Sequence, residues 1–121
     1  MKVLITGATG LVGTALTELC HNNGIDVNYL TTSKDKIQSK NNYKGFYWNT
    51  KTDEIDEACF DGVETIFHLA GATIAQRWSV ENRKAIFESR VVTTRLLYST
   101  LSRKRKKGEN ITVKHFITAS A

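Results

Sequence analysis

Three glycines in one short run are the residues of this chain best suited to binding chemistry. They occupy the first, fourth and seventh positions of Gly7-Ala8-Thr9-Gly10-Leu11-Val12-Gly13, directly after an apolar stretch and before a helical pattern. In such a turn the first glycine permits a tight bend, the second lets the backbone approach a pyrophosphate, and the third lets the helix pack close to the strand. Free N–H groups at the start of the helix, assisted by the helix dipole, attract phosphate. The run therefore predicts a dinucleotide-phosphate site, with a purely structural strand-to-helix turn as the alternative interpretation.

The elements that position this turn follow from the hydrophobic pattern. Apolar runs predict strands at residues 2–6, 26–31, 45–48, 64–70 and 113–118, and helical spacing predicts helices from Leu11 to the stop at Gly24 and over residues 79–102. The polar residues 33–43 fit a loop or a short helix. Helical crossovers between strands give a parallel sheet with helices on both faces. The predicted fold class is therefore α/β: one domain, residues 1–121, with a Rossmann-type doubly wound parallel sheet of about five strands, order 3-2-1-4-5, truncated after the fifth strand.

Two regions of the pattern carry interpretations of their own. The second helix is expected to face the sheet with residues that recur every three or four positions: Phe87, Val91, Thr94, Tyr98 and Leu101. His68 lies inside an apolar strand and is interpreted as a hydrogen-bonded core residue rather than a ligand.

The composition excludes several classes of protein. Hydrophobic residues make up 40% and charged residues 24%, as in ordinary globular proteins. No stretch approaches the roughly 20 apolar residues of a membrane span, and the apolar start is too short for a signal peptide, so we expect a cytoplasmic protein without membrane contact. Cys20 and Cys59 share no close spacing with each other or with the histidines, so we expect no metal site, no disulfide and two buried or idle thiols.

The positive charge is concentrated in one place. The net charge is +5, and residues 103–107 are all basic. This run lacks the interleaved aromatic residues of a nucleic-acid site, so it is interpreted as a solvated basic loop, and no nucleic-acid partner is expected.

The glycine run is one of several motifs that point to a known family. Together with His68-Leu69-Ala70-Gly71, Arg77-Trp78 and a helix bearing Lys84 and Ser89-Arg90, it resembles the extended short-chain dehydrogenase/reductase superfamily. More narrowly, it resembles the atypical branch of NAD-dependent epimerase/dehydratase-like, or sugar nucleotide epimerase-like, proteins. The resemblance runs along essentially the whole chain. It implies an NAD(P) cofactor and an unidentified small-molecule substrate, with sugar nucleotides as a candidate class.

The end of the second strand bears on the choice of cofactor. NAD-binding relatives carry an acidic residue there for the ribose hydroxyls, whereas this chain has Thr31-Thr32-Ser33-Lys34. The resembled branch usually has arginine at the position of Thr32, and Lys34 supplies only a point charge, or is an ordinary surface lysine. Because no carboxylate at Thr31 or Thr32 would repel a 2′-phosphate and Lys34 lies nearby, we expect NADP, with NAD as the second choice. The expected cofactor-binding residues are Gly7, Thr9, Gly10, Leu11, Val12, Gly13, Thr31, Thr32, Ser33, Lys34, Leu69, Ala70, Gly71 and Arg77, the last of which is equally well explained as a surface charge.

The sequence contains a counterpart for only one of the family's catalytic residues. Superfamily members use a tyrosine as acid/base, a lysine four residues later and a serine or threonine that orients the substrate. The resemblance places Ser120 at the serine position, with Thr118 as second choice, and puts the tyrosine and lysine beyond Ala121. We therefore expect the dinucleotide-binding part of an epimerase/dehydratase or oxidoreductase, inactive as this stretch. The alternative is a free-standing NADP-binding regulatory or redox-sensing module.

The last predicted strand bears on assembly. No helix follows it in the sequence, so apolar surface beside Val113, Phe116 and Ile117 is expected to remain uncovered. Exposed apolar patches favour association. We therefore expect a homo-oligomer or a fragment of a longer chain.

Overall fold

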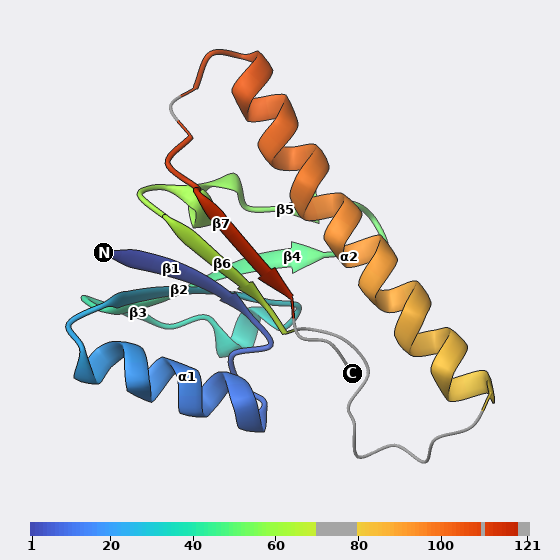
Figure 1. Ribbon diagram of the computed structural model, residues 1–121, viewed down its shortest axis with the longest axis horizontal. Helices are drawn as coiled ribbons and strands as arrows, with labels where there is room; N and C mark the ends of the chain where they lie inside the picture. The colour runs from blue at the N-terminus through green and yellow to red at the C-terminus, as the bar shows by residue number, and fades with distance from the viewer. Residues whose placement is uncertain (70–79, 110, 119–121) are drawn as a thin grey trace.

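A central, mostly parallel sheet organises the computed structural model, which describes residues 1–69, 80–109 and 111–118, with the backbone only for residues 80–90 (Figure 1). The strands are β1 (Lys2–Thr6), β2 (Asp26–Thr31), β3 (Ser39–Lys40), β4 (Tyr43–Asn49), β5 (Glu54–Ile55), β6 (Thr65–His68) and β7 (His115–Thr118). The helices are α1 (Leu11–Asn22) and α2 (Val80–Lys106), with short 3-10 turns η1 (Lys34–Lys36) and η2 (Glu57–Phe60).

The strand order confirms the predicted fold class. The sheet runs β3-β4-β2-β1-β6-β7, and the pairs β4–β2, β2–β1, β1–β6 and β6–β7 are all parallel. Its parallel part is thus the predicted 3-2-1-4-5 arrangement. The short strands β3 and β5 pair antiparallel with β4 and were not predicted. Both have only two residues, too few to show an alternating pattern in the sequence.

Two layers of core lie on the two faces of the sheet. Along β1, Val3 and Ile5 belong to the cluster that includes Cys20 of α1, whereas Leu4 belongs to the cluster that includes Leu97 of α2. Successive strand residues point to opposite faces, so β1 contributes side chains to both layers of the core. The two helices accordingly cover opposite faces of the sheet (Figure 1). The apolar run of β1 was therefore a reliable signal for a strand that is buried on both faces.

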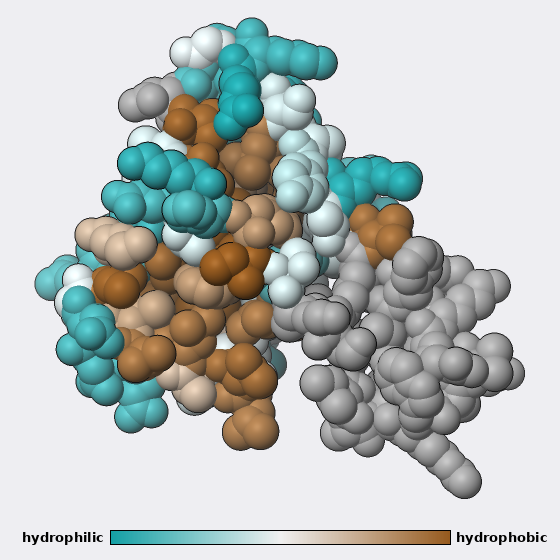
Figure 2. Space-filling view, viewed as in Figure 1, coloured by the Kyte–Doolittle hydropathy of each residue, from teal (hydrophilic) through white to brown (hydrophobic). Residues whose placement is uncertain are grey.

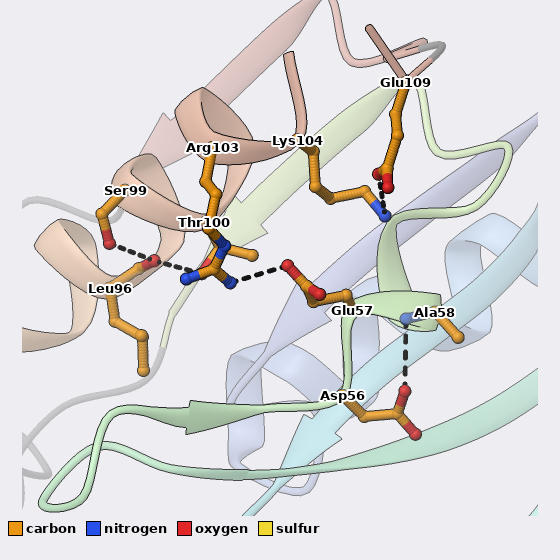
Figure 3. A network of polar contacts seen from close by, with 9 residues as sticks. All are labelled: Asp56, Glu57, Ala58, Leu96, Ser99, Thr100, Arg103, Lys104 and Glu109. Carbon is orange, nitrogen blue, oxygen red and sulfur yellow. Dashed lines mark hydrogen bonds and ion pairs between the residues drawn. The ribbon is translucent and has the colours of Figure 1, made fainter. Parts of the chain in front are cut away.

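The basic run corrects one expectation, because it is helical rather than a loop. Helix α2 continues to Lys106, four residues beyond the predicted end at Ser102. Lysine and arginine are good helix formers. Arg103 also pairs with Glu57 of η2 at 2.7 Å, and Lys104 pairs with Glu109 at 3.1 Å (Figure 3). The helix ends where Gly108 takes a φ of 76°, a common glycine role at helix ends.

The face that α2 presents to the sheet agrees with the prediction only in part: Leu101 packs against the core as expected, and Tyr98 reaches the sheet only at its edge, where it stacks on Phe116 of β7. Val91 and Tyr98, expected to face the sheet, are 37% and 54% exposed. The side chain of Phe87 lies outside the described residues. Four other residues form the buried row: Thr93, Leu96, Leu97 and Thr100. The hydroxyl of Thr100 donates to the carbonyl of Leu96 at 2.8 Å, so this polar residue is buried without losing its hydrogen bond. Threonines in a buried row hide it from a search for hydrophobic periodicity.

Apolar side chains remain on the face of α1 and β7 (Figure 2). Leu11 is 91% exposed, Leu19 is 59% exposed and Ile117 is 47% exposed. Val113 and Phe116 are half-buried, and Phe116 stacks on Tyr98 with the ring centroids 4.7 Å apart. The expected uncovered surface is thus present at Ile117 and smaller than expected at the other two positions. In the described part of the chain, neither helix combines the length and apolar character needed to cross a membrane.

Candidate nucleotide-binding site

The glycine turn leaves the start of α1 open. Gly7 has a φ of 74°, a left-handed conformation that only glycine adopts easily, and its carbonyl accepts a hydrogen bond from the N–H of Gly10 at 3.1 Å. Gly10 precedes the helix, no side chain caps it, and the first turn of α1 contains no acidic residue. The first helical N–H groups and the positive end of the dipole therefore face the turn without competition from a carboxylate, as a phosphate site requires.

The last two glycines of the turn differ in how tightly they are packed. A Cβ atom on Gly13 would lie 2.1 Å from the carbonyl oxygen of Gly7 and 2.7 Å from the Cα of Ala8, so no side chain fits. A Cβ atom on Gly10 would lie 3.4 Å from the same oxygen. Gly13 is thus needed for the helix to approach the strand, whereas Gly10 keeps the outer surface of the turn free of a side chain.

A cavity of about 290 Å³ connects this turn with the end of β2, and we call it the turn–β2 cavity. Five of the predicted site residues line it: Gly7, Thr9, Thr31, Thr32 and Ser33. Thr31 keeps the bend after β2 in place, because its hydroxyl accepts a hydrogen bond from the N–H of Ser33 at 3.1 Å. The volume lies at the lower limit for small-molecule sites. The structure thus brings together the two predicted halves of the site.

Four predicted residues lie at the turn or on α1 but do not line this cavity: Gly10, Leu11, Val12 and Gly13. Leu69 lies just after β6 and is half-buried, with its N–H donating to the carbonyl and hydroxyl of Thr6. The ammonium of Lys34 lies 4.9 Å from the ring centroid of Tyr47 and is not part of the cavity lining. Ala70, Gly71, Arg77 and Ser120 lie outside the described residues.

The cavity also contains residues that the sequence analysis did not select: Leu30, Lys36, Trp48, Thr50 and Thr93. Trp48 and Thr50 lie at the carboxyl end of β4, which is where open α/β sheets bind ligands, so the predicted strand at 45–48 could have indicated them. Thr93 comes from α2, and the face predicted for that helix did not include it. No local signal distinguishes Lys36 from the other lysines around it.

A buried histidine contacts Thr93, one of the residues that line the turn–β2 cavity. His68 is 3% exposed, and its Nδ1 lies 2.7 Å from the hydroxyl of Thr6, while its Nε2 lies 2.8 Å from the hydroxyl of Thr93. The histidine therefore joins β1, β6 and α2 at the carboxyl ends of the strands. This agrees with its interpretation as a hydrogen-bonded core residue.

One pair in the chain has the spacing of the family's tyrosine and lysine. Lys51 follows Tyr47 by four residues, although the resemblance places the family's tyrosine and lysine beyond Ala121. Residues four apart share a face in a helix, but Tyr47 lies in β4 and Lys51 in the turn after it. Neither residue lines the turn–β2 cavity. The spacing therefore arises here without the helical geometry that would make the two side chains neighbours.

The thiols and the metal-ligating residues offer no second site in the part of the chain that the structure describes. Cys20 and Cys59 are both free and buried, as expected. Burial raises the pKa of the Cys59 thiol far above its ordinary value and also raises the pKa of Cys20. Thiols held in the protonated form are poor nucleophiles. Among the described residues, no group of three or more His, Cys, Asp or Glu side chains is placed to hold a metal ion.

Comparison with known proteins identifies the family. A model of the NAD dependent epimerase/dehydratase family matches residues 3–121, and the chain belongs to this family, as the resemblance implied. An epimerase family protein of Staphylococcus haemolyticus is 31% identical over 112 residues, which cover 89% of this chain and 35% of that protein. The chain thus spans about a third of the length of the curated relatives that it matches.

Solved structures agree with this assignment. The UDP-glucose 4-epimerase of Bifidobacterium longum, in complex with NAD+ and UDP, aligns with a TM-score of 0.73 at 18% identity and covers 100% of this chain and 37% of that one. A human epimerase family protein with NADPH aligns with a TM-score of 0.54 at 27% identity and covers 84% of this chain and 32% of that one. The first likeness shows the fold alone, and the second also shows a relative crystallised with a phosphorylated dinucleotide.

Proposed function

We propose that this chain binds NADP(H), and NAD(H) more weakly, at the turn–β2 cavity. The observation that carries the proposal is that one cavity joins Gly7 and Thr9 of the glycine turn to residues 31–33 at the end of β2. In this arrangement the pyrophosphate meets the uncapped start of α1 and the adenosine ribose meets the end of β2. Ala70, Gly71 and Arg77 remain proposed cofactor contacts.

The preference for NADP rests on charge. None of the described residues that line the cavity is acidic, so no carboxylate is placed there to bind the ribose hydroxyls or to repel a 2′-phosphate. One lysine, Lys36, lines the cavity. The human relative with NADPH supports the same preference.

Isothermal titration calorimetry of the folded chain with NADP and NAD tests the proposal. Gly10→Val should abolish binding of both while leaving the circular dichroism spectrum unchanged, because Gly10 has a φ of −74° and tolerates a side chain by itself. Gly10→Ala is the matched smaller change and should weaken binding less. A wild-type chain that binds neither dinucleotide, or a Gly10→Val chain that binds as wild type does, would contradict the proposal.

We further propose that the chain supplies the dinucleotide-binding part of an epimerase/dehydratase or oxidoreductase. Sugar nucleotides are the candidate substrate class, as the name of the Bifidobacterium relative suggests, and Ser120 is the proposed substrate-orienting residue. Acid/base groups typically contribute about 10² to 10⁴-fold to a rate. A chain that binds NADP but shows no hydride transfer to or from sugar nucleotides is the expected result. Sustained turnover by these 121 residues would contradict it.

The exposed apolar residues support a proposal about assembly. Leu11 and Leu19 of α1 are largely exposed, and Ile117 of β7 is about half exposed. Apolar surface of this kind is usually covered by another chain or segment. We expect light scattering of the 121-residue chain to show a dimer or larger species, and a stable monomer would contradict self-association.

A further inference from the structure

The two lysines between β2 and β3 have different surroundings. The ammonium of Lys34 lies 4.9 Å from the ring centroid of Tyr47, and Lys34 is not among the residues that line the cavity. Lys36 lines the turn–β2 cavity beside Thr31, Thr32 and Ser33, and it is the one charged residue among the described lining residues. Lys36 forms no ion pair with any residue in the described part of the chain. Its charge is therefore available to a ligand, whereas that of Lys34 already contacts an aromatic ring.

A buried tyrosine fixes the backbone that carries Lys36. The hydroxyl of Tyr29 donates to the carbonyl of Lys36 at 2.6 Å and accepts a hydrogen bond from the N–H of Gln38 at 2.8 Å. The N–H of Lys36 in turn donates to the carbonyl of Ser33 at 3.1 Å. One side-chain hydroxyl thus holds the segment immediately on both sides of Ile37, so the lysine is presented from a fixed backbone.

The tyrosine itself is held by its neighbours. Tyr29 is 1% exposed and stacks on Tyr43 with the ring centroids 4.3 Å apart. A Cβ atom on Gly45 of β4 would lie 2.5 to 2.8 Å from atoms of the Tyr29 ring, so the ring occupies the space that this glycine leaves. The ring cannot shift toward β4, and its hydroxyl is therefore aimed at the segment of residues 36–38.

We propose that Lys36, positioned by Tyr29, is the residue that selects the 2′-phosphate of NADP, and that Lys34 is not. The inference rests on the proposed dinucleotide binding and names the residue that discriminates between the two cofactors. A lysine ammonium is a point charge that binds phosphate without a fixed bidentate geometry, so a stable backbone is what places it. The hydroxyls of Thr31, Thr32 and Ser33 around it add neutral hydrogen-bonding groups that both cofactors can use.

Matched alanine variants of the two lysines test the proposal. Titration calorimetry at fixed salt should show that Lys36→Ala weakens NADP about 10- to 100-fold, as expected for loss of a charge-assisted hydrogen bond, and changes NAD less than about 2-fold. Lys34→Ala should leave both affinities within about 2-fold, and Lys36→Arg should retain the NADP preference. The opposite pattern, with Lys34→Ala weakening NADP and Lys36→Ala having no effect, would overturn the proposal, as would equal weakening of both cofactors by Lys36→Ala. A wild-type chain that binds neither cofactor would instead contradict the proposed function.

Tyr29→Phe tests the positioning role separately. Phenylalanine keeps the ring stacked on Tyr43 and removes both hydrogen bonds to the segment. We expect a loss of NADP affinity smaller than that of Lys36→Ala, with NAD little changed. In a double-mutant cycle, Tyr29→Phe should cause no further loss once Lys36 is alanine, because the tyrosine acts through the lysine. Equal loss for both cofactors, or additive losses in the cycle, would show a merely structural tyrosine.

Discussion

The glycine turn and the segment of residues 33–38 border the same cavity but are fixed by different means. The turn is fixed by backbone packing, since a Cβ atom on Gly13 would lie 2.1 Å from the carbonyl oxygen of Gly7. The segment is fixed by one side chain, because the hydroxyl of Tyr29 hydrogen-bonds to the backbone of the residues immediately before and after Ile37. Backbone packing permits almost no substitution, whereas a segment held from outside can change its own side chains. Under the proposed function, the first region would hold the dinucleotide and the second would choose between dinucleotides.

The largest expected effect comes from Gly13→Ala. The new methyl group would overlap backbone atoms of Gly7 and Ala8, which cannot move without displacing β1. We expect a loss of about 3 kcal/mol or more in the free energy of unfolding, or failure to fold. Urea denaturation measures it, with Gly10→Ala as the control at about 1 kcal/mol or less. Similar stability for the two variants would remove the distinction between the two glycines.

A smaller loss of stability is expected at His68, which contacts the cavity-lining Thr93. His68→Leu removes the contacts of the ring nitrogens with Thr6 and Thr93, both of which are buried. Losing partners of buried polar groups costs about 1 to 3 kcal/mol. Thermal and urea unfolding should show this loss, whereas the same change at the exposed His115 should cost under about 0.5 kcal/mol. Equal stability of the two variants would mean that the histidine network does not hold the strand ends.

The smallest effect is expected at the end of α2, far from either region. Arg103 and Glu57 form an ion pair whose side chains are 53% and 39% exposed (Figure 3). Arg103→Met should therefore cost about 0.5 kcal/mol or less, and less still at high salt. Lys106→Met is the control on the same helix. A loss above about 1 kcal/mol would contradict this ranking.

The same pair predicts a pH dependence. The hydrogen bond from Arg103 lowers the pKa of Glu57 below its ordinary value of 4.5. A lowered pKa in the folded state means that the stabilisation is present above the ordinary pKa and is lost as the pH falls through the lowered one. The stability difference between wild type and Arg103→Met should thus be constant near neutral pH and shrink below pH 4.5. A difference that grows on acidification would contradict the assignment.

The sequence predicted the strands well because β1, β2 and β6 are buried on both faces and are centred on apolar or β-branched residues. The glycine turn was predictable because its three regularly spaced glycines come directly after a strand and before a helix. The buried face of α2 was not, because Thr93 and Thr100 lie in it and satisfy their hydroxyls there.

The cavity-lining lysine was equally hidden from sequence. Lys34 and Lys36 are both exposed, and only the contact of one with Tyr47 and the position of the other in the cavity separate them. These differences arise from pairing of β2 with β4, which no local pattern encodes.

An NMR titration of the ¹⁵N-labelled chain with NADP locates the dinucleotide directly. Amide shifts should be concentrated at the glycine turn and around Thr31 and Lys36. The groove between α2 and β7, a cavity of about 260 Å³ lined by Tyr98, Leu101 and Phe116 among others, provides the internal control and should not respond. Saturable shifts confined to the first set are the predicted result. Shifts centred on the α2–β7 groove, or none at the glycine turn, would show that the dinucleotide does not bind at the turn–β2 cavity.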